Sequence, residues 1–262
     1  MKRLHFSYTM QIEYSLPVQR CNFTIKCIPL NTARQRVDNF KISLLPDVEY
    51  CEGVDGLGNK QIYGLNEEEH RSFSFNIEGD VVTGLASYEE GEDDNLSAIF
   101  RHPYGLNKPG QSIQAFFNSL RLDDLSLRDK AMYILNALKY QLVYKTGSTN
   151  VGTTAEEAMA QRCGVCQDYA HIYISLLHLA GIPARYVTGL IIGEGASHAW
   201  VEILDDHIWY GIDPTNDCIV GDNYIKIGVG RDARDCMINR GIMHGGGPQL
   251  QTINVSVIEK KG

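Results

Sequence analysis

The sequence contains no run of lysine and arginine residues, and its overall charge is acidic. Its 262 residues carry 24 basic and 32 acidic side chains, which gives a formal net charge of −8. Proteins that bind nucleic acid or anionic membranes by electrostatic attraction need a basic surface. We therefore expect that neither nucleic acid nor a membrane is a partner of this protein.

Long apolar segments and a paired set of cysteines are also missing. No segment approaches the roughly 20 apolar residues that a membrane-spanning helix needs. Residues 1–14 alternate polar and apolar side chains, whereas a secretory signal has a continuous apolar run. The seven cysteines are an odd number, which suits a reducing compartment better than a disulfide scaffold. The sequence therefore predicts a cytoplasmic location.

The amino-terminal part shows repeated alternation of apolar and polar residues. Apolar side chains occupy every second position in residues 8–14, 21–27 and 73–77. A period of two is typical of β-strands with one buried face. We predict that residues 1–104 form an antiparallel β-sandwich domain. Residues 253–257 alternate in the same way and predict a further strand near the end of the chain.

After residue 105 the pattern changes to helices. Ser126 and Asp129 form a predicted capping box, and the apolar residues that follow recur at helical spacing. Thr154 and Glu157 predict the start of a shorter helix in the same way. We assign residues 105–262 to the second domain of an α+β protein.

A cysteine stands at the predicted start of a further helix. Apolar residues recur at three- and four-residue steps over residues 167–180, which predicts a helix with one buried stripe. Gly181, with Pro183 beyond it, predicts the end of this helix. Cys166 therefore lies in the first turn, where unpaired N–H groups and the helix dipole favour a thiolate. The same N–H groups can bind the oxyanion that forms when a thiolate attacks a carbonyl carbon.

Three short runs rich in valine, isoleucine, tyrosine and tryptophan follow this helix. They cover residues 185–192, 198–204 and 207–212, and their composition predicts β-strands. Asp205 and Asp206 are the only turn-like pair between the last two runs. We predict that these two runs form an antiparallel hairpin with that pair at its tip.

The predicted hairpin brings a histidine and an aspartate together. With the turn at its tip, Leu204 lies opposite His207, and counting outward places His198 opposite Asp213. Directly opposed residues in an antiparallel pair have Cα atoms about 4.5–5.5 Å apart. Cys166, His198 and Asp213 are therefore candidates for a catalytic triad of nucleophile, general base and orienting carboxylate.

Other interpretations of these residues stay open. A free cysteine is commonly a small buried apolar residue, and a lone strand histidine is often structural. Cys163 and Cys166 also form a CxxC pair, which occurs in thioredoxin-like redox proteins and in zinc sites. The residues before the pair favour a helix over a strand, and no second cysteine pair follows. The acidic run at residues 89–94 is predicted to be a solvated loop, so we expect no metal ion and no cofactor.

Five motifs occur in order in the second half of the chain. They are residues 154–158 (TAEEA), 164–170 (GVCQDYA), 181–187 (GIPARYV), 198–202 (HAWVE) and 213–216 (DPTN). Together they resemble the transglutaminase-like superfamily of papain-like cysteine enzymes, and within it the bacterial transglutaminase-like putative cysteine proteases. The similarity extends to residues 8–29 and to residues 230–232.

The resemblance implies an α+β fold in which the helix with the cysteine packs on an antiparallel sheet. It implies that Cys166, His198 and Asp213 are the nucleophile, the general base and the orienting acid. It also implies thiol-dependent attack on an amide or related acyl carbon of a peptide or protein substrate. The chain departs from the family where an aromatic residue is usual after Asp232, and there Arg231 and Asp232 either line the cleft or form a surface ion pair.

The predicted function is hydrolysis of an amide or peptide bond through a thioester acyl-enzyme. Water is always present as an acyl acceptor, which favours hydrolysis over transfer to an amine. A protein-glutamine acyltransferase and a catalytically silent peptide-binding module of the same fold stay as alternatives.

Overall fold

The structure is a computed structural model, which describes residues 1–86, 89–90 and 98–260. The acidic run at residues 89–94, predicted to be a solvated loop, lies mostly outside the described residues. Its first two residues form strand β6 (Glu89–Glu90).

The amino-terminal residues form most of an eight-stranded antiparallel sheet. Strand β1 is 24 residues long and has partners along both edges, which are β5 and β16 for its first half and β4 and β15 for its second. The alternation at residues 253–257 therefore corresponds to a strand, as predicted. The strands of this sheet are β1 (Lys2–Ile25), β2 (Gln35–Leu45), β3 (Tyr50–Val54), β4 (Lys60–Asn66), β5 (His70–Thr83), β10 (Gly193–Gly195), β15 (Asn239–Gly245) and β16 (Gln249–Glu259).

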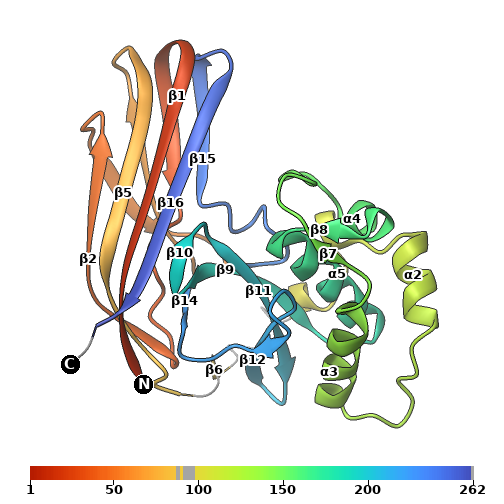
Figure 1. Cartoon of the computed structure of the whole chain (residues 1–262). Coiled ribbons are helices and arrows are strands. Elements are labelled where there is room, and N and C mark those ends of the chain that lie inside the picture. The colour runs from red at the N-terminus through yellow and green to blue at the C-terminus, as the bar shows by residue number, and fades with distance from the viewer. Residues whose placement is uncertain (87–88, 91–97, 261–262) are drawn as a thin grey trace.

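This sheet folds over on itself so that its two halves pack face to face. Strands β1, β15 and β16 turn over together at the top of Figure 1. The Phe23 ring, in the second half of β1, lies 5.1 Å from the ring of Phe73, whose strand pairs with the first half of β1. Apolar residues at alternate positions fill the space between the halves. The predicted antiparallel sandwich is confirmed.

A second antiparallel sheet of six strands lies between the sandwich and the helices (Figure 1). The three strands predicted at residues 185–192, 198–204 and 207–212 are confirmed to within one residue at each end. Its remaining strands extend the sheet at its two edges. In order across the sheet the strands are β13 (Cys218–Ile219), β12 (Ile208–Asp213), β11 (His198–Asp205), β9 (Ala184–Ile191) and β14 (Tyr224–Gly230), with β6 beside β12.

Helices cover the face of this sheet that points away from the sandwich. Ser126 and Thr154 cap two of them by accepting hydrogen bonds from the N–H groups of Asp129 and Glu157, as predicted. A two-stranded parallel pair lies among the helices. The elements of this part are η1 (Ala98–Phe100), η2 (Gly105–Asn107), α2 (Gln111–Asn118), α3 (Leu127–Leu138), β7 (Val143–Tyr144), α4 (Ala155–Gln161), β8 (Cys163–Gly164) and α5 (Cys166–Leu179).

Helix α5 is the centre of the helical part. Residues 168–177 are all buried, so the prediction of a single buried stripe is wrong. The helix packs against β9 and β11 on one side, while α2, α3 and α4 cover it on others. A helix that is enclosed in this way can bury residues around its whole circumference. Gly181, at a positive φ of 76°, ends it where the sequence predicted.

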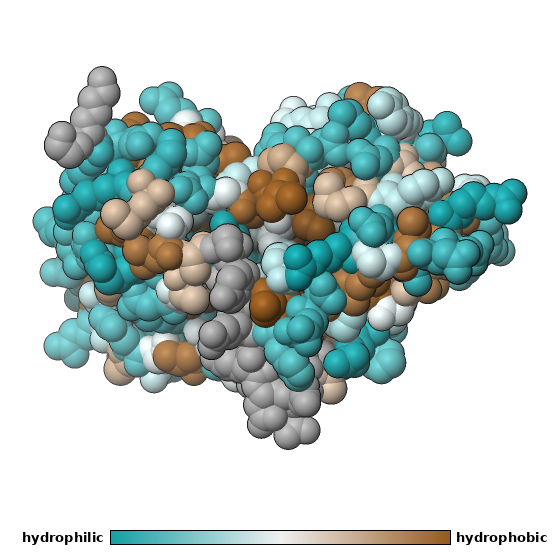
Figure 2. Space-filling model, turned by 90° about the horizontal axis from the view of Figure 1, so that it is seen from below, coloured by the Kyte–Doolittle hydropathy of each residue, from teal (hydrophilic) through white to brown (hydrophobic). Residues whose placement is uncertain are grey.

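The sandwich and the second sheet share part of one apolar core. Leu190, Ile225 and Ile227, from β9 and β14, pack among the sandwich residues. Seen from below, the two parts form two masses with a notch between them at the upper edge of the view (Figure 2). The division into domains at residues 1–104 and 105–262 stays a prediction, and β15 and β16 pair with the amino-terminal sheet across it.

The fold is α+β with mainly antiparallel strands, as predicted. Among the residues that the structure describes, no helix has the length and apolar character that crossing a bilayer requires.

Candidate active site

Cys166 is the first residue of helix α5, as the sequence predicted, and its side chain is partly exposed. The chain enters the helix through Val165, whose N–H donates to Oδ2 of Asp168 over 2.7 Å. The hydroxyl of Thr149 donates to the same oxygen over 2.6 Å. The Asp168 carboxylate therefore caps the start of α5 and fixes the turn that presents the cysteine.

The start of α5 also supplies a free backbone donor at the cysteine. The N–H groups of Asp168 and Tyr169 both donate to the carbonyl of Val165, which closes the first turn. The N–H of Cys166 precedes these two groups and, like the first donors of any α-helix, has no acceptor within the helix. An oxyanion formed next to the thiol can accept this hydrogen bond.

His198 and Asp213 are in direct contact. Nε2 of His198 lies 2.7 Å from Oδ2 of Asp213. The histidine side chain is 11% exposed and the aspartate side chain is fully buried. The Cys166 thiol lies near the same imidazole and contributes to the rise of its pKa. The structure therefore brings together the three residues that the sequence singled out.

The predicted register of the hairpin is wrong by two residues. Asp206 and His207 form the turn, with φ values of 50° and 60°, and Leu204 pairs with Trp209 instead of His207. Consecutive positive φ angles match the right-handed twist of a hairpin, which explains why the turn lies one residue later than predicted. Because side chains alternate with a period of two, the two-residue shift keeps His198 and Asp213 on the same face. They meet as diagonal neighbours instead of opposed ones.

Asp213 is held by more hydrogen bonds than the sequence predicted. Its Oδ2 accepts from the Asn216 amide over 2.7 Å and from the Tyr224 hydroxyl over 2.9 Å, in addition to His198. Its Oδ1 accepts the N–H groups of Thr215 and Asn216. Burial raises the pKa of the Asp213 carboxyl, but the hydrogen bonds, with that of His198 the largest, outweigh burial and hold the pKa below its usual value. Asp213 is therefore a buried carboxylate that keeps its charge.

The environment of His198 favours its protonated form. Burial alone lowers the pKa of His198, but the hydrogen bonds to Asp213 and Cys166 outweigh burial and raise the pKa to about 9. The rings of Trp200 and Tyr224 lie 6.5 Å and 6.2 Å from the imidazole and restrict its orientation. At neutral pH the protonated imidazole can stabilise a thiolate on Cys166.

Two partners of Asp213 were not found from the sequence. Asn216 belongs to the DPTN motif, so its position three residues after the aspartate was a usable signal. Tyr224 begins β14 and Asp213 ends β12, and β11 and β9 lie between these two strands in the sheet. Nothing in the local sequence indicates that β14 pairs with β9 and so brings Tyr224 towards Asp213.

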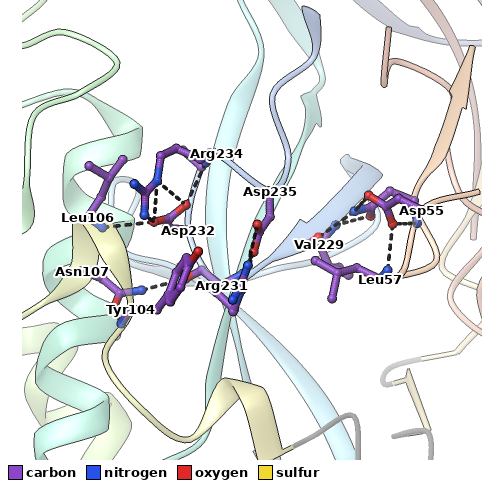
Figure 3. Close-up of polar contacts among 12 residues, drawn as sticks. Asp55, Leu57, Tyr104, Leu106, Asn107, Val229, Arg231, Asp232, Arg234 and Asp235 are labelled. Carbon is purple, nitrogen blue, oxygen red and sulfur yellow. Dashed lines mark hydrogen bonds and ion pairs between the residues drawn. The ribbon is translucent and has the colours of Figure 1, made fainter. Parts of the chain in front are cut away.

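The segment after β14 forms a polar network around one buried carboxylate, Asp232 (Figure 3). Asp232 is fully buried and accepts hydrogen bonds from the Leu106 N–H and from the Arg234 guanidinium. Arg231 pairs with Asp235 and not with Asp232. The interpretation of Arg231 and Asp232 as a surface ion pair is therefore wrong, because each selects a partner further along the same tight turn.

The same segment connects the helical part to the sandwich. The Arg231 guanidinium lies 3.6 Å from the centre of the Tyr104 ring, just before η2. Lys26, at the end of β1, donates to the carbonyl of Asp235 and to the carboxylate of Asp55. The segment therefore joins both parts of the molecule (Figure 3).

Comparison with known families identifies two matching regions. Residues 115–214 match the transglutaminase-like superfamily, and residues 4–82 match the bacterial transglutaminase-like N-terminal region. The chain belongs to the transglutaminase-like superfamily. The superfamily match ends one residue after Asp213, so it contains all three candidate residues.

Similar proteins occur in mycobacteria and in a solved structure. An uncharacterized protein of Mycobacterium tuberculosis is 29% identical over 257 residues, which cover 82% of this chain and 79% of that protein. An uncharacterized protein of Mycobacterium leprae is 40% identical over 117 residues, 41% of this chain and 42% of its own length. The crystal structure of a putative cysteine protease from Cytophaga hutchinsonii has a TM-score of 0.82 at 21% identity, covering 100% of this chain and 91% of that one. The last match shows that the two proteins share a fold, and superfamily membership supports a cysteine-dependent hydrolase or acyltransferase.

Proposed function

We propose that this protein is a cysteine-dependent hydrolase of amide or peptide bonds, with Cys166, His198 and Asp213 as its catalytic triad. The observation that carries the proposal is the position of His198, which hydrogen-bonds the buried Asp213 carboxylate and lies near the Cys166 thiol. Nε2 of His198 contacts the carboxylate, so Nδ1 is the ring nitrogen that remains for the thiol. A thiol, a base and an orienting carboxylate in this order form the arrangement of an activated nucleophile.

In the proposed acylation step the Cys166 thiolate attacks the substrate carbonyl carbon. The oxygen becomes an oxyanion, which the backbone N–H of Cys166 stabilises. When the oxyanion collapses, the C–N bond breaks and the His198 imidazolium donates its proton to the leaving amine. The products of this step are a free amine and a thioester on Cys166.

In the deacylation step water attacks the thioester. Neutral His198 removes a proton from the water as the new C–O bond forms. The C–S bond then breaks, the acid product leaves, and the thiolate and imidazolium are restored. Asp213 keeps its charge throughout and stabilises the imidazolium that forms in each turnover.

An amine in place of water would make the protein a protein-glutamine acyltransferase. Superfamily membership supports both outcomes, and the general availability of water favours hydrolysis. The catalytically silent peptide-binding module is less favoured, because all three catalytic positions are filled and His198 contacts the Asp213 carboxylate directly.

A peptide and isopeptide library, with wild type and Cys166→Ala compared side by side, tests the proposal. We expect cleavage by wild type only, and intact-mass spectrometry of an acid-quenched reaction should show an acyl group on Cys166. Addition of an excess of a primary amine separates the two enzyme classes, since abundant amine-linked product would identify an acyltransferase. Cleavage by Cys166→Ala at the wild-type rate would contradict the proposal.

We also propose that the protein acts in the cytoplasm. All seven cysteines are free thiols, and the exposed Cys51 would be open to oxidation in an oxidising compartment. Fractionation of cells that produce a carboxyl-terminally tagged chain should recover it with cytosolic markers. Recovery with markers of the cell envelope would contradict this location.

A further inference from the structure

The short parallel pair β7–β8 leads directly into the nucleophile. Strand β8 consists of Cys163 and Gly164, and Cys166 follows two residues later. Strand β7, Val143 and Tyr144, pairs with β8 along one edge. In the part of the chain that the structure describes, no other strand pairs with β7. The second edge of β7 is therefore open beside the candidate active site.

The hydrogen bonds of the pair show which backbone groups face the open edge. The N–H of Val143 donates to the carbonyl of Arg162, and the N–H of Lys145 donates to the carbonyl of Gly164, each over 3.0 Å. Consecutive residues of a strand direct their backbone groups to opposite edges. The N–H and C=O of Tyr144, between these two residues, therefore point away from β8. One donor and one acceptor are available at this edge for another extended chain.

The Tyr144 side chain connects this edge to the nucleophile. Burial, and then the nearby Cys166 and Asp168, raise the pKa of the Tyr144 phenol, so its ring lies within electrostatic range of the thiol. The ring lies 6.3 Å from that of Tyr169, on the first turn of α5. Val143 and Tyr144 are nevertheless 67% and 52% exposed, which is unusual for two adjacent apolar side chains next to a reactive group.

We propose that an extended peptide substrate binds by adding a strand to the open edge of β7, through the backbone N–H and C=O of Tyr144. This inference rests on the proposed function, and it specifies how the substrate is held. The occupant is the substrate main chain on one side of the scissile carbonyl, with apolar side chains against Val143 on one face of the strand and Tyr144 on the other. Backbone pairing supplies affinity without sequence preference, and the two apolar side chains supply the selectivity.

The expected substrate class follows from these contacts. It is an unfolded or flexible peptide segment that contains an apolar residue close to the reacting amide. A folded protein whose chain cannot extend at that point would not fit, because its backbone groups are already hydrogen-bonded. An isolated carboxamide without a flanking peptide would lack both backbone bonds and would bind more weakly.

The test uses peptide binding to Cys166→Ala, which removes the chemistry and leaves the strand edge intact. The probes are fluorescein-labelled hexapeptide amides with one leucine and one glutamine in an alanine background, each methylated at a different backbone nitrogen. We expect N-methylation at one position to weaken binding about fivefold to tenfold, which corresponds to loss of one backbone hydrogen bond. Equal affinity for every methylated peptide would overturn the strand-addition proposal.

A pair of substitutions links the sensitive position to Tyr144. Tyr144→Phe retains the backbone N–H, so the same single position should remain sensitive to methylation. Tyr144→Pro removes the N–H that donates to a peptide C=O and keeps the Tyr144 carbonyl, so it should bind the unmethylated peptide about fivefold to tenfold more weakly than Tyr144→Phe does. Equal affinity of Tyr144→Pro and Tyr144→Phe for the unmethylated peptide would overturn the assignment. The methylation series itself needs no change in β7, so the test holds even if Tyr144→Pro does not fold.

Failure of this inference is distinguishable from failure of the proposed function. Binding with one sensitive position, but no cleavage by the wild-type chain, would support strand addition and contradict the hydrolase. Cleavage with no sensitive position would support the hydrolase and contradict strand addition. Moving the leucine along the hexapeptide should change affinity most at residues adjacent to the sensitive nitrogen, since only these lie beside Val143 and Tyr144.

Discussion

Two buried histidines near the start of α5 have opposite acid–base properties. His198, at the start of β11, has a pKa raised to about 9, while His171, on α5, has a pKa lowered to about 4. Burial lowers the pKa of both. The difference lies in their partners, because His198 contacts the Asp213 carboxylate directly and His171 accepts a hydrogen bond from the backbone N–H of Ala233.

This contrast separates a histidine that can move protons from one that holds the fold. The imidazole of His171 is fully buried, packs 5.1 Å from the Tyr186 ring and lies beneath the segment that joins the two parts. A neutral, enclosed imidazole fixes that segment and cannot exchange protons with a substrate. His198, with a charged carboxylate on one nitrogen, is suited to both acid and base catalysis.

The largest expected effect comes from replacing each histidine by alanine. His198→Ala should lower kcat/KM on a cleaved peptide by about 10³- to 10⁴-fold or more, because it removes the proton carrier. His171→Ala should lower the free energy of unfolding by about 2–4 kcal/mol, through a cavity and an unsatisfied N–H at Ala233. Steady-state kinetics and urea unfolding of both variants check this. An equal loss of activity in the two folded proteins would contradict the division of roles.

Removing the charge that distinguishes the two sites should have the next largest effect. Asp213→Asn keeps the size of the side chain but presents no carboxylate to His198, so kcat/KM should fall about 10²- to 10⁴-fold. The pKa of His198 should move down from about 9 towards that of a buried neutral histidine. Activity and an NMR titration of the His198 ring measure these effects. A variant with an unchanged His198 pKa would show that Asp213 is not the cause of the shift.

The two histidines should also change stability in opposite pH ranges. The contribution of His198 to the free energy of unfolding is complete below pH 6.5. It is lost as the pH rises to about 9, because the folded state then releases the proton that it held more tightly. The contribution of His171 is present above pH 6.5 and is lost as the pH falls to about 4, because the unfolded chain binds the proton first. Each histidine contributes about 3 kcal/mol to the free energy of unfolding in the pH range where its contribution is complete.

Urea unfolding from pH 4 to pH 9 measures both effects, with His171→Gln as the control for the acid range. The difference in the free energy of unfolding between wild type and His171→Gln should decrease as the pH falls below 6.5. A constant difference would mean that His171 does not remain neutral in the folded protein.

The smallest effect is expected from the tyrosine behind the aspartate. Tyr224→Phe removes the hydroxyl that donates to Asp213 over 2.9 Å and leaves the ring beside His198. Four other hydrogen bonds to Asp213 remain, so kcat/KM should fall only about threefold to tenfold. We also expect the basic limb of the pH–rate profile of Tyr224→Phe to shift by a small amount. A reduction as large as that of Asp213→Asn would contradict the idea that several donors share the charge.

The sequence was sufficient for the elements that depend on local patterns. The caps at Ser126 and Thr154, the end of α5 at Gly181 and the position of Cys166 follow from residues within one or two turns of each other. The contact between His198 and Asp213 was expected for a partly incorrect reason. The register was wrong by two residues, and only the alternation of side chains kept the pair on one face.

The remaining features depend on contacts between distant parts of the chain. Tyr224 contacts Asp213 through a strand order that local sequence does not determine. The burial of His171 and Asp232 results from packing of the segment after β14 against α5 and η2, which no periodicity indicates. The long strand β1 crosses both halves of the sandwich, and its pairing with β15 and β16 joins the two ends of the chain.

Alkylation of individual thiols by iodoacetamide at pH 7 tests the pairing of Cys166 with His198 most directly. Peptide mapping by mass spectrometry gives the rate for each cysteine, and the exposed Cys51 is the internal reference. We expect Cys166 to react at least about tenfold faster than Cys51, and we expect His198→Ala to remove that advantage. Alkylation of Cys166 no faster than Cys51 in the wild-type protein would contradict an activated nucleophile.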